Sequence, residues 1–191
     1  MQARLERAFS FGDHMTCIVG IAEGGKVYIG ADSAGVGGLD LTVRADRKVF
    51  VNGDFVMGFT TSFRMVQLIQ YAFNPPKRHP DKDVMAYMVT EFVDALRNCL
   101  KAGGFARRDS EVESGGVFLV GYAGRLFCIE SDYQVGEALS GYDAVGCGAS
   151  FAVGVLFATP GQPPEDRLRL ALQAAEAHSA GVRNPFHIQS I

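Results

Sequence analysis

A threonine, an aspartate and a lysine in the first quarter of the chain have side chains that could cooperate in nucleophilic chemistry. Thr16 follows Met15, Asp32 lies 16 residues after Thr16, and Lys48 lies 32 residues after it. If the chain were trimmed before Thr16, that residue would carry its hydroxyl and a free α-amine together. An amine beside a hydroxyl can take the hydroxyl proton, which is a recognised way to activate a threonine nucleophile. The three residues are therefore candidates for one catalytic site.

The residues between Thr16 and Asp32 have the pattern of a β-hairpin. Two apolar runs, 16–22 and 26–32, are separated by three residues, of which the last is Gly25. A three-residue loop with a glycine in the left-handed conformation is a common hairpin connection. In the register that this loop sets, Thr16 lies opposite Asp32 and the apolar side chains share one face. An ordinary hairpin in which Asp32 merely ends a strand fits the same pattern.

The segments that carry these residues resemble the start of proteasome β-type subunits. They resemble equally the bacterial peptidase subunit of the two-component ATP-dependent protease. The segments are Thr16–Ile21, Gly30–Ser33 and Arg47–Phe50. In that family the nucleophilic threonine is followed by an aspartate and a lysine at the intervals found here. The likeness runs in order from Thr16 to about Ala180, which is nearly the whole chain.

The resemblance implies two further site residues. Gly58, in a strand end, matches the glycine whose N–H serves the oxyanion hole, and Cys147 takes the place of a serine that supports the threonine. The chain departs from the family after Asp32, where the usual arginine is missing. The family's late Asp…Ser pair is also not evident, and either Ser179 or Asn184 is a candidate substitute.

The function that the resemblance implies is hydrolysis of peptide bonds by an N-terminal threonine. The substrate would be a peptide or an unfolded protein, the chain would form a homo-oligomeric ring, and an ATPase unfoldase is a partner that the family allows. The chemistry needs no metal and no cofactor. Two alternatives stay open: a ring-forming subunit without catalysis, and an amidohydrolase for small amides. Cys17 as the N-terminal nucleophile would shift every interval by one residue.

Composition excludes several other classes of protein. The chain has 191 residues and a net charge of −3, with no basic block of the kind that binds nucleic acid. No stretch approaches the roughly 20 apolar residues that span a bilayer. The four cysteines form no CxxC pair or His/Cys cluster, so they predict no metal site; they are expected to be reduced, as in the cytoplasm.

Residues 1–15 are interpreted as a leader, a propeptide or the result of a misassigned start. They contain charged residues but no apolar region of the secretory type. Met15 stands directly before Thr16, so translation from Met15 and removal of that methionine would expose the threonine amine. Autocatalytic removal of a short propeptide on assembly would have the same result. Residues 16–191 are expected to form a single domain.

The remaining pattern predicts an α+β fold with two antiparallel sheets stacked between helical layers. The resemblance also implies this four-layer αββα sandwich, which is the fold of N-terminal nucleophile (Ntn) hydrolases. Strands come first, then two helices, more strands, two helices and a closing strand. The expected strands are 41–45, 48–51, 55–60, 116–121, 125–130, 133–139 and 186–191. The expected helices are 63–73, a segment from residue 81 or 83 to 100, 149–158, and one from 164 that ends at Gly181. The polar segment 107–111 is expected to be a loop, and the Gly146-Cys147-Gly148 turn does not have the spacing of a phosphate-binding loop.

Overall fold

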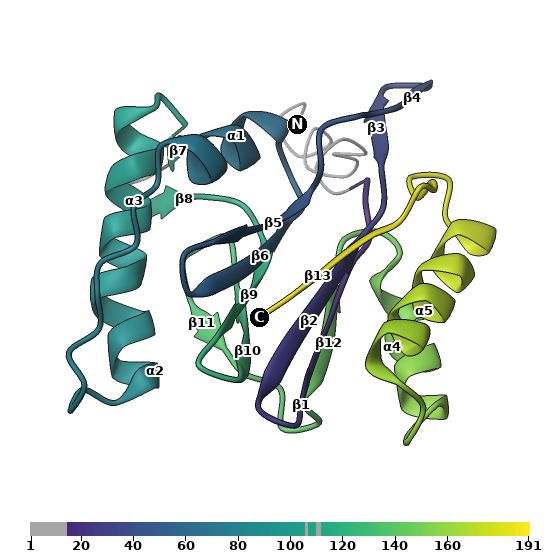
Figure 1. The fold of residues 1–191 in the computed structure, drawn as a ribbon. Coiled ribbons are helices and arrows are strands. Elements are labelled where there is room, and N and C mark those ends of the chain that lie inside the picture. The colour runs from purple at the N-terminus through teal and green to yellow at the C-terminus, as the bar shows by residue number, and fades with distance from the viewer. Residues whose placement is uncertain (1–14, 106, 110–111) are drawn as a thin grey trace, which may run out of the picture.

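The chain folds as a mixed α and β structure built on two larger antiparallel sheets. The computed structural model describes residues 15–105, 107–109 and 112–191. Figure 1 shows one group of helices on each side of the sheets, with the two sheets between them. The expected α+β class with antiparallel sheets is therefore confirmed. No helix in these described ranges combines the length and apolar character needed to cross a membrane.

The first sheet carries the candidate nucleophile. It has four strands in the order β12-β1-β2-β13. Their bounds are Ile18–Glu23 for β1, Lys26–Ala31 for β2, Tyr142–Val145 for β12 and His187–Ser190 for β13. Helices α4 (Ala149–Ala158) and α5 (Pro164–His178) cover its outer face, where Val19 and Ile21 pack against Leu168 and Leu172. Burial of these apolar side chains fixes the sheet against the helices.

The second sheet has five strands in the order β11-β10-β9-β6-β5. Their bounds are Val49–Asn52 for β5, Phe55–Phe59 for β6, Phe118–Tyr122 for β9, Arg125–Ile129 for β10 and Val135–Gly136 for β11. Its outer face is covered by α1 (Phe63–Tyr71) and by a continuous helical segment of α2 (Val84–Tyr87), a π-helical turn (Met88–Phe92) and α3 (Val93–Ala102). Aromatic stacking is dense here, for example between Phe55 and Phe92 with ring centroids 5.1 Å apart.

The two sheets face each other across a third cluster of apolar side chains. Ile18, Ile29 and Val27 of the first sheet meet Val56 and Leu119 of the second, and all five are fully buried. Gly58 lies at this interface, since a Cβ on it would come within 2.5 Å of Ile18. Both faces of the first sheet are thus covered, one by helices and one by the second sheet.

The structure corrects the register of the first hairpin. Glu23 pairs with Lys26, so the loop has two residues, Gly24 and Gly25, and not three. Both glycines have positive φ, 61° and 77°, as the two-residue turn that matches the twist of a hairpin requires. The expected register assumed one apolar face and one solvated face. That constraint does not act here, because both faces of the sheet are buried.

Several short elements were not expected from the sequence. Strand β3 (Ala34–Gly37) was not expected; it pairs with β4 (Asp40–Val43), which overlaps the strand expected at 41–45. Strand β12, which forms an edge of the first sheet, was also not expected. The segment expected to be a loop contains β7 (Arg107–Asp109), which pairs with β8 (Val112–Ser114). Helix α5 ends at His178, three residues before Gly181. Helix α4 has the expected bounds.

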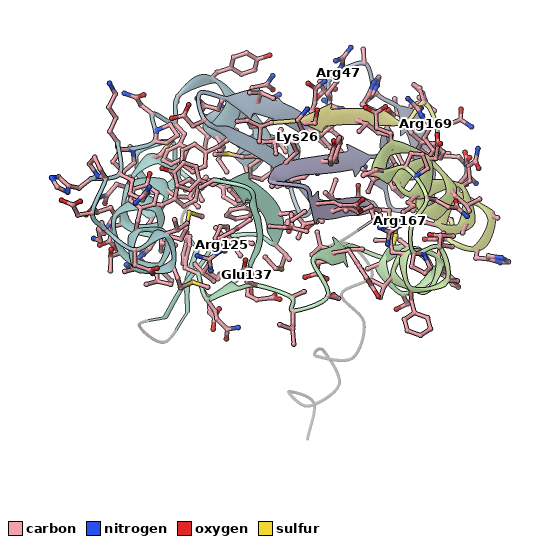
Figure 2. All side chains as sticks on the ribbon, turned by 60° about the horizontal axis from the view of Figure 1, so that its bottom comes forward. Lys26, Arg47, Arg125, Glu137, Arg167 and Arg169 are labelled. Carbon is pink, nitrogen blue, oxygen red and sulfur yellow. The ribbon has the colours of Figure 1, made fainter. Side chains whose placement is uncertain are left out.

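A buried arginine ties α5 to α4 and to the first hairpin. Arg167, labelled in Figure 2 where α5 meets α4, is 6% exposed and donates to the carbonyl of Leu156 at 2.8 Å. Its other terminal nitrogen lies 3.4 Å from the carboxylate of Glu23. The exposed Arg169 of the same helix is also labelled.

We expect Arg167→Ala to lower the free energy of unfolding by about 1–3 kcal/mol, because the Leu156 carbonyl and the Glu23 carboxylate lose a charged partner and a cavity is left. Urea denaturation of the two variants measures this effect. Arg169→Ala is the matched control, and its free energy of unfolding should stay within about 0.5 kcal/mol of the parent value. Equal losses for both variants would contradict a structural role for Arg167.

Candidate active site

The carboxylate of Asp32 is the centre of a buried hydrogen-bond network. Its Oδ1 accepts from the Thr16 hydroxyl, from the Cys17 backbone N–H at 3.0 Å and from Lys48 Nζ at 2.8 Å. Its Oδ2 accepts from the backbone N–H groups of Ala34 at 2.8 Å and Arg183 at 3.2 Å. Asp32 is fully buried. With five donors around it, the carboxylate is held in one orientation.

Thr16, Asp32 and Lys48 are brought together by the ends of three strands. Thr16 precedes β1, Asp32 follows β2, and Lys48 precedes β5 of the other sheet. Lys48 Nζ donates to Thr16 Oγ1 at 2.5 Å. Although the two-residue loop pairs Asp32 with Cys17 and not with Thr16, the Asp32 carboxylate reaches Thr16 beyond the regular ladder. The contact expected from the sequence is therefore present, in a different register.

Burial controls the electrostatics of the site. Lys48 is 4% exposed, and this desolvation lowers the pKa of its ammonium, while the charge and hydrogen bond of Asp32 act in the opposite direction. Burial, followed by the negative charge of Asp32, raises the pKa of the Cys17 thiol. Cys17 is thus a neutral core residue, with its side chain in the cluster beneath α4 and α5. The thiolate that a nucleophilic cysteine needs is disfavoured there.

The turn of Gly146, Cys147 and Gly148 wraps around the carbonyl of Thr16. The Gly148 N–H donates to that carbonyl at 3.3 Å and the Cys147 thiol does so at 3.4 Å. Gly146 has a φ of 99°, and a Cβ on it would lie 2.3 Å from the same oxygen. Only glycine fits this close approach. Cys147 thus contacts the backbone of the candidate nucleophile through the turn that follows β12.

Of the two residues that the sequence left open, the structure brings Ser179 to the site. Ser179 follows α5, and its hydroxyl donates to the Cys147 sulfur at 3.0 Å. Asn184 instead donates to Glu176, with its side-chain amide at 2.9 Å and its backbone N–H at 3.0 Å. The choice between them depends on where the chain runs after α5, which residue types alone did not indicate.

Gly58 lies near the end of β6, as the resemblance implies, but its N–H takes part in the sheet ladder. The Phe59 N–H donates to the carbonyl of Lys48, the residue directly before β5. The Thr60 N–H donates to the carbonyl of Val117, the residue directly before β9. Because alternate residues of a strand point their N–H groups at opposite neighbours, Gly58 N–H points toward Leu119 of β9. Its donor therefore belongs to the sheet ladder, and its Cα faces the core between the sheets. This geometry gives Gly58 a packing role in place of the oxyanion role.

A cavity of about 70 Å³ opens beside the threonine. Lys48 forms one wall and Met15, the residue before Thr16, forms another. The remaining lining comes from the β3 strand, the end of β6 and the start of α1: Ala34, Val36, Phe59, Thr60, Thr61, Ser62, Phe63 and Val66. Thr61 has a φ of 65°, which is unusual for a β-branched residue and was not indicated by any sequence pattern.

Solved structures share this fold over nearly the whole chain. BPH from Thiobacillus denitrificans has a TM-score of 0.75 and 21% identity, over 92% of this chain and 97% of its own. The structure of BPH in complex with epoxomicin has the same TM-score and identity, over 92% of this chain and 98% of its own. HslV from Trypanosoma brucei has a TM-score of 0.67 and 19% identity over 92% of this chain and 98% of its own. Anbu, the ancestral beta-subunit of Yersinia bercovieri, has a TM-score of 0.65 and 15% identity over 92% of this chain and 81% of its own. No protein-family model matches the sequence, and neither does any curated protein sequence.

Proposed function

We propose that this chain, which has the fold of proteasome-like Ntn-hydrolase β subunits, is a threonine-type peptidase whose nucleophile is Thr16. The observation that supports this most is the buried contact of Thr16, Asp32 and Lys48, with Lys48 Nζ 2.5 Å from the threonine hydroxyl. A core threonine with a merely structural role does not need an adjacent buried ion pair, which costs desolvation.

In the proposed mechanism, removal of residues 1–15 frees the α-amine of Thr16. Thr16 Oγ1 attacks the carbonyl of a peptide bond, and the amine takes the hydroxyl proton, directly or through a water. An ordinary α-amine has a pKa of about 7.7–8.0, and a charged Lys48 nearby would lower it further, which keeps the amine neutral. Asp32 holds Lys48 charged and oriented. The C–N bond of the substrate then breaks, and the protonated α-amine gives its proton to the departing amine. Water next hydrolyses the threonine ester, which releases the carboxylic acid and restores the Thr16 hydroxyl and free amine.

Two parts of this assignment differ from the sequence-based one. The oxyanion donor is assigned to the backbone between Thr60 and Phe63, which lines the cavity next to Lys48, in place of Gly58. The support on the far side of Thr16 is assigned to Cys147 together with Ser179. A hydrogen-bonded pair of this kind can orient the amine after trimming, much as a third group orients the base in other nucleophilic enzymes.

The wider assignment covers architecture, assembly and location. The sheets and helices are proposed to form the four-layer αββα sandwich of Ntn hydrolases, over a single domain of residues 16–191. Residues 1–14 lie outside the described residues, and we propose that residues 1–15 are a propeptide or a misassigned start. We further propose that the chain forms a homo-oligomeric ring in the cytoplasm. This ring would act on peptides or unfolded proteins, with or without an ATPase unfoldase. Exposed Phe151 and Phe157 on the apolar helix α4 support self-association.

Two measurements on the untagged protein test the function. Intact mass should begin at Thr16, and a peptide epoxyketone should then add to Thr16, because that warhead needs both the hydroxyl and the free amine. The second candidate is a ring-forming subunit without catalysis, which the replacement of the supporting serine by Cys147 favours. It predicts an assembled ring without any labelling. A mass that retains Met15 in the assembled protein would also contradict the peptidase.

A further inference from the structure

We propose that the cavity beside Thr16 selects substrates by the side chain on the amino side of the cleaved bond, and that it accepts a small, neutral, aliphatic one. This inference rests on the proposed function. The cavity shares Lys48 with the threonine site, and Lys48 Nζ lies 2.5 Å from Thr16 Oγ1. A peptide carbonyl in position for attack by that oxygen therefore places its own side chain at the mouth of the cavity.

The volume of the cavity limits the size of that side chain. It measures about 70 Å³, whereas an apolar cavity that binds benzene in another protein measures roughly 150 Å³. The far wall contains Phe59 and Val66, which are 1% and 4% exposed and belong to the core beneath α1. Met15 forms the side next to Thr16, so trimming widens the mouth and leaves this far wall in place. Alanine, valine or leucine fits such a space better than an aromatic ring.

The charges around the cavity disfavour a basic side chain. Lys48 is the charged residue of the lining, and no carboxylate lines the cavity among the residues that the structure describes. Arg44 stacks on Phe63, with its guanidinium carbon 3.9 Å from the ring centroid, so a second cation lies behind that wall. A buried lysine or arginine of a substrate would lose its hydration and gain no partner of opposite charge.

An acidic side chain has little to gain from these cations. Asp32 already pairs with Lys48 at 2.8 Å, and Asp46 engages Arg44 through two hydrogen bonds of 2.7 and 2.8 Å. The lining hydroxyls also serve the fold, since Thr60 donates to the Val117 carbonyl and Ser62 caps α1. The remaining surface is apolar, which favours a neutral hydrocarbon side chain.

The test compares fluorogenic peptides that differ only in the residue before the cleaved bond. With protein trimmed to Thr16, kcat/KM should be at least about tenfold higher for alanine, valine or leucine than for phenylalanine, arginine or glutamate. Val66→Ala should raise kcat/KM for phenylalanine relative to valine by about tenfold, because the far wall recedes. Val93→Ala is the matched control: Val93 is 6% exposed in the same core but does not line the cavity.

The outcomes separate this inference from the proposed function. Three results would overturn the inference and leave the peptidase assignment in place. They are a higher kcat/KM for arginine or phenylalanine, equal kcat/KM values for all the peptides, and equal changes in kcat/KM for Val66→Ala and Val93→Ala. Absence of cleavage of every peptide, with no epoxyketone adduct on trimmed protein, would overturn the proposed function and this inference with it. The expected preference, altered by Val66→Ala alone, supports both.

Discussion

Replacing Thr16 by alanine is expected to abolish peptide hydrolysis while the protein stays folded. The substitution removes the attacking oxygen, and loss of a nucleophile lowers kcat by about 10⁴–10⁶-fold in enzymes where it has been isolated. The fold should survive, because Lys48 and Asp32 keep their own contact at 2.8 Å and the lost hydrogen bonds contribute only about 1–2 kcal/mol. Turnover of a fluorogenic peptide and the urea midpoint of the same preparation give the two results.

Thr16→Ser is the matched control for this experiment. It keeps the hydroxyl and, after trimming, the amine, so measurable activity and epoxyketone labelling should remain. Both variants must be compared as proteins that begin at residue 16, since alanine at this position could also block autocatalytic trimming. Turnover in Thr16→Ala close to that of the parent would exclude Thr16 as the nucleophile.

Cys17 offers a direct check on the alternative nucleophile. Its side chain is fully buried in the cluster with α4 and α5, and burial raises the pKa of its thiol. Cys17→Ala should therefore lower the free energy of unfolding by about 1–2 kcal/mol, as expected for a buried side chain of this size. It should leave kcat nearly unchanged. The opposite result, loss of turnover with Cys17→Ala but not with Thr16→Ala, would restore the reading in which Cys17 attacks.

The sequence allowed the site to be predicted where it depends on intervals along the chain. The hairpin pattern brought Asp32 near Thr16, and the intervals shared with proteasome β-type subunits implied that Lys48 joins them. Helix α4 was predicted at its observed bounds because the glycine turn at 146–148 precedes a fully apolar run. In both cases local chain geometry and burial agree, which makes the pattern informative.

Features set by the surrounding structure were not predictable in the same way. The hairpin register was wrong because the pattern cannot show that both faces of the first sheet are covered. The resemblance implied an oxyanion role for Gly58, but the direction of its N–H depends on the partner strands β5 and β9. Ser179 was distinguished from Asn184 only by the path of the chain after α5. Each of these depends on contacts between segments far apart in sequence.

Asp32→Asn is expected to cause the largest loss of stability at the site, together with loss of activity. Asparagine keeps the shape of the carboxylate but presents an amide N–H₂ on one side. The donors now around the carboxylate include Lys48 on Oδ1 and the N–H groups of Ala34 and Arg183 on Oδ2, so an amide must turn its own donors toward some of them. Breaking a buried ion pair by removing one partner typically costs about 3–5 kcal/mol.

The loss should depend on pH in a direction that identifies Lys48 as its cause. Burial lowers the pKa of Lys48 in the folded protein below its value of 10.5, and Asp32 opposes that shift. Between the folded and unfolded pKa values the unfolded chain binds more protons, so the free energy of unfolding rises with pH. Removing the Asp32 charge lowers the pKa of Lys48 in the folded protein further. The pH range over which the free energy of unfolding rises should therefore extend to lower pH in Asp32→Asn than in the parent.

The double variant Asp32→Asn with Lys48→Met separates the ion pair from the rest of the network. Methionine removes the buried charge that asparagine leaves unpaired, so the double variant should lose less stability than the two single losses added together. Urea denaturation between pH 6 and 9 measures all four proteins, and the pH slope seen in Asp32→Asn should disappear when Lys48 is absent. Strict additivity, or a slope that persists without Lys48, would mean that the backbone donors to Asp32 carry the effect. Peptide turnover should fall by at least about 100-fold in every variant. Lys48→Met removes the positive charge that keeps the Thr16 amine neutral, and Asp32→Asn removes the partner that holds Lys48 charged and oriented.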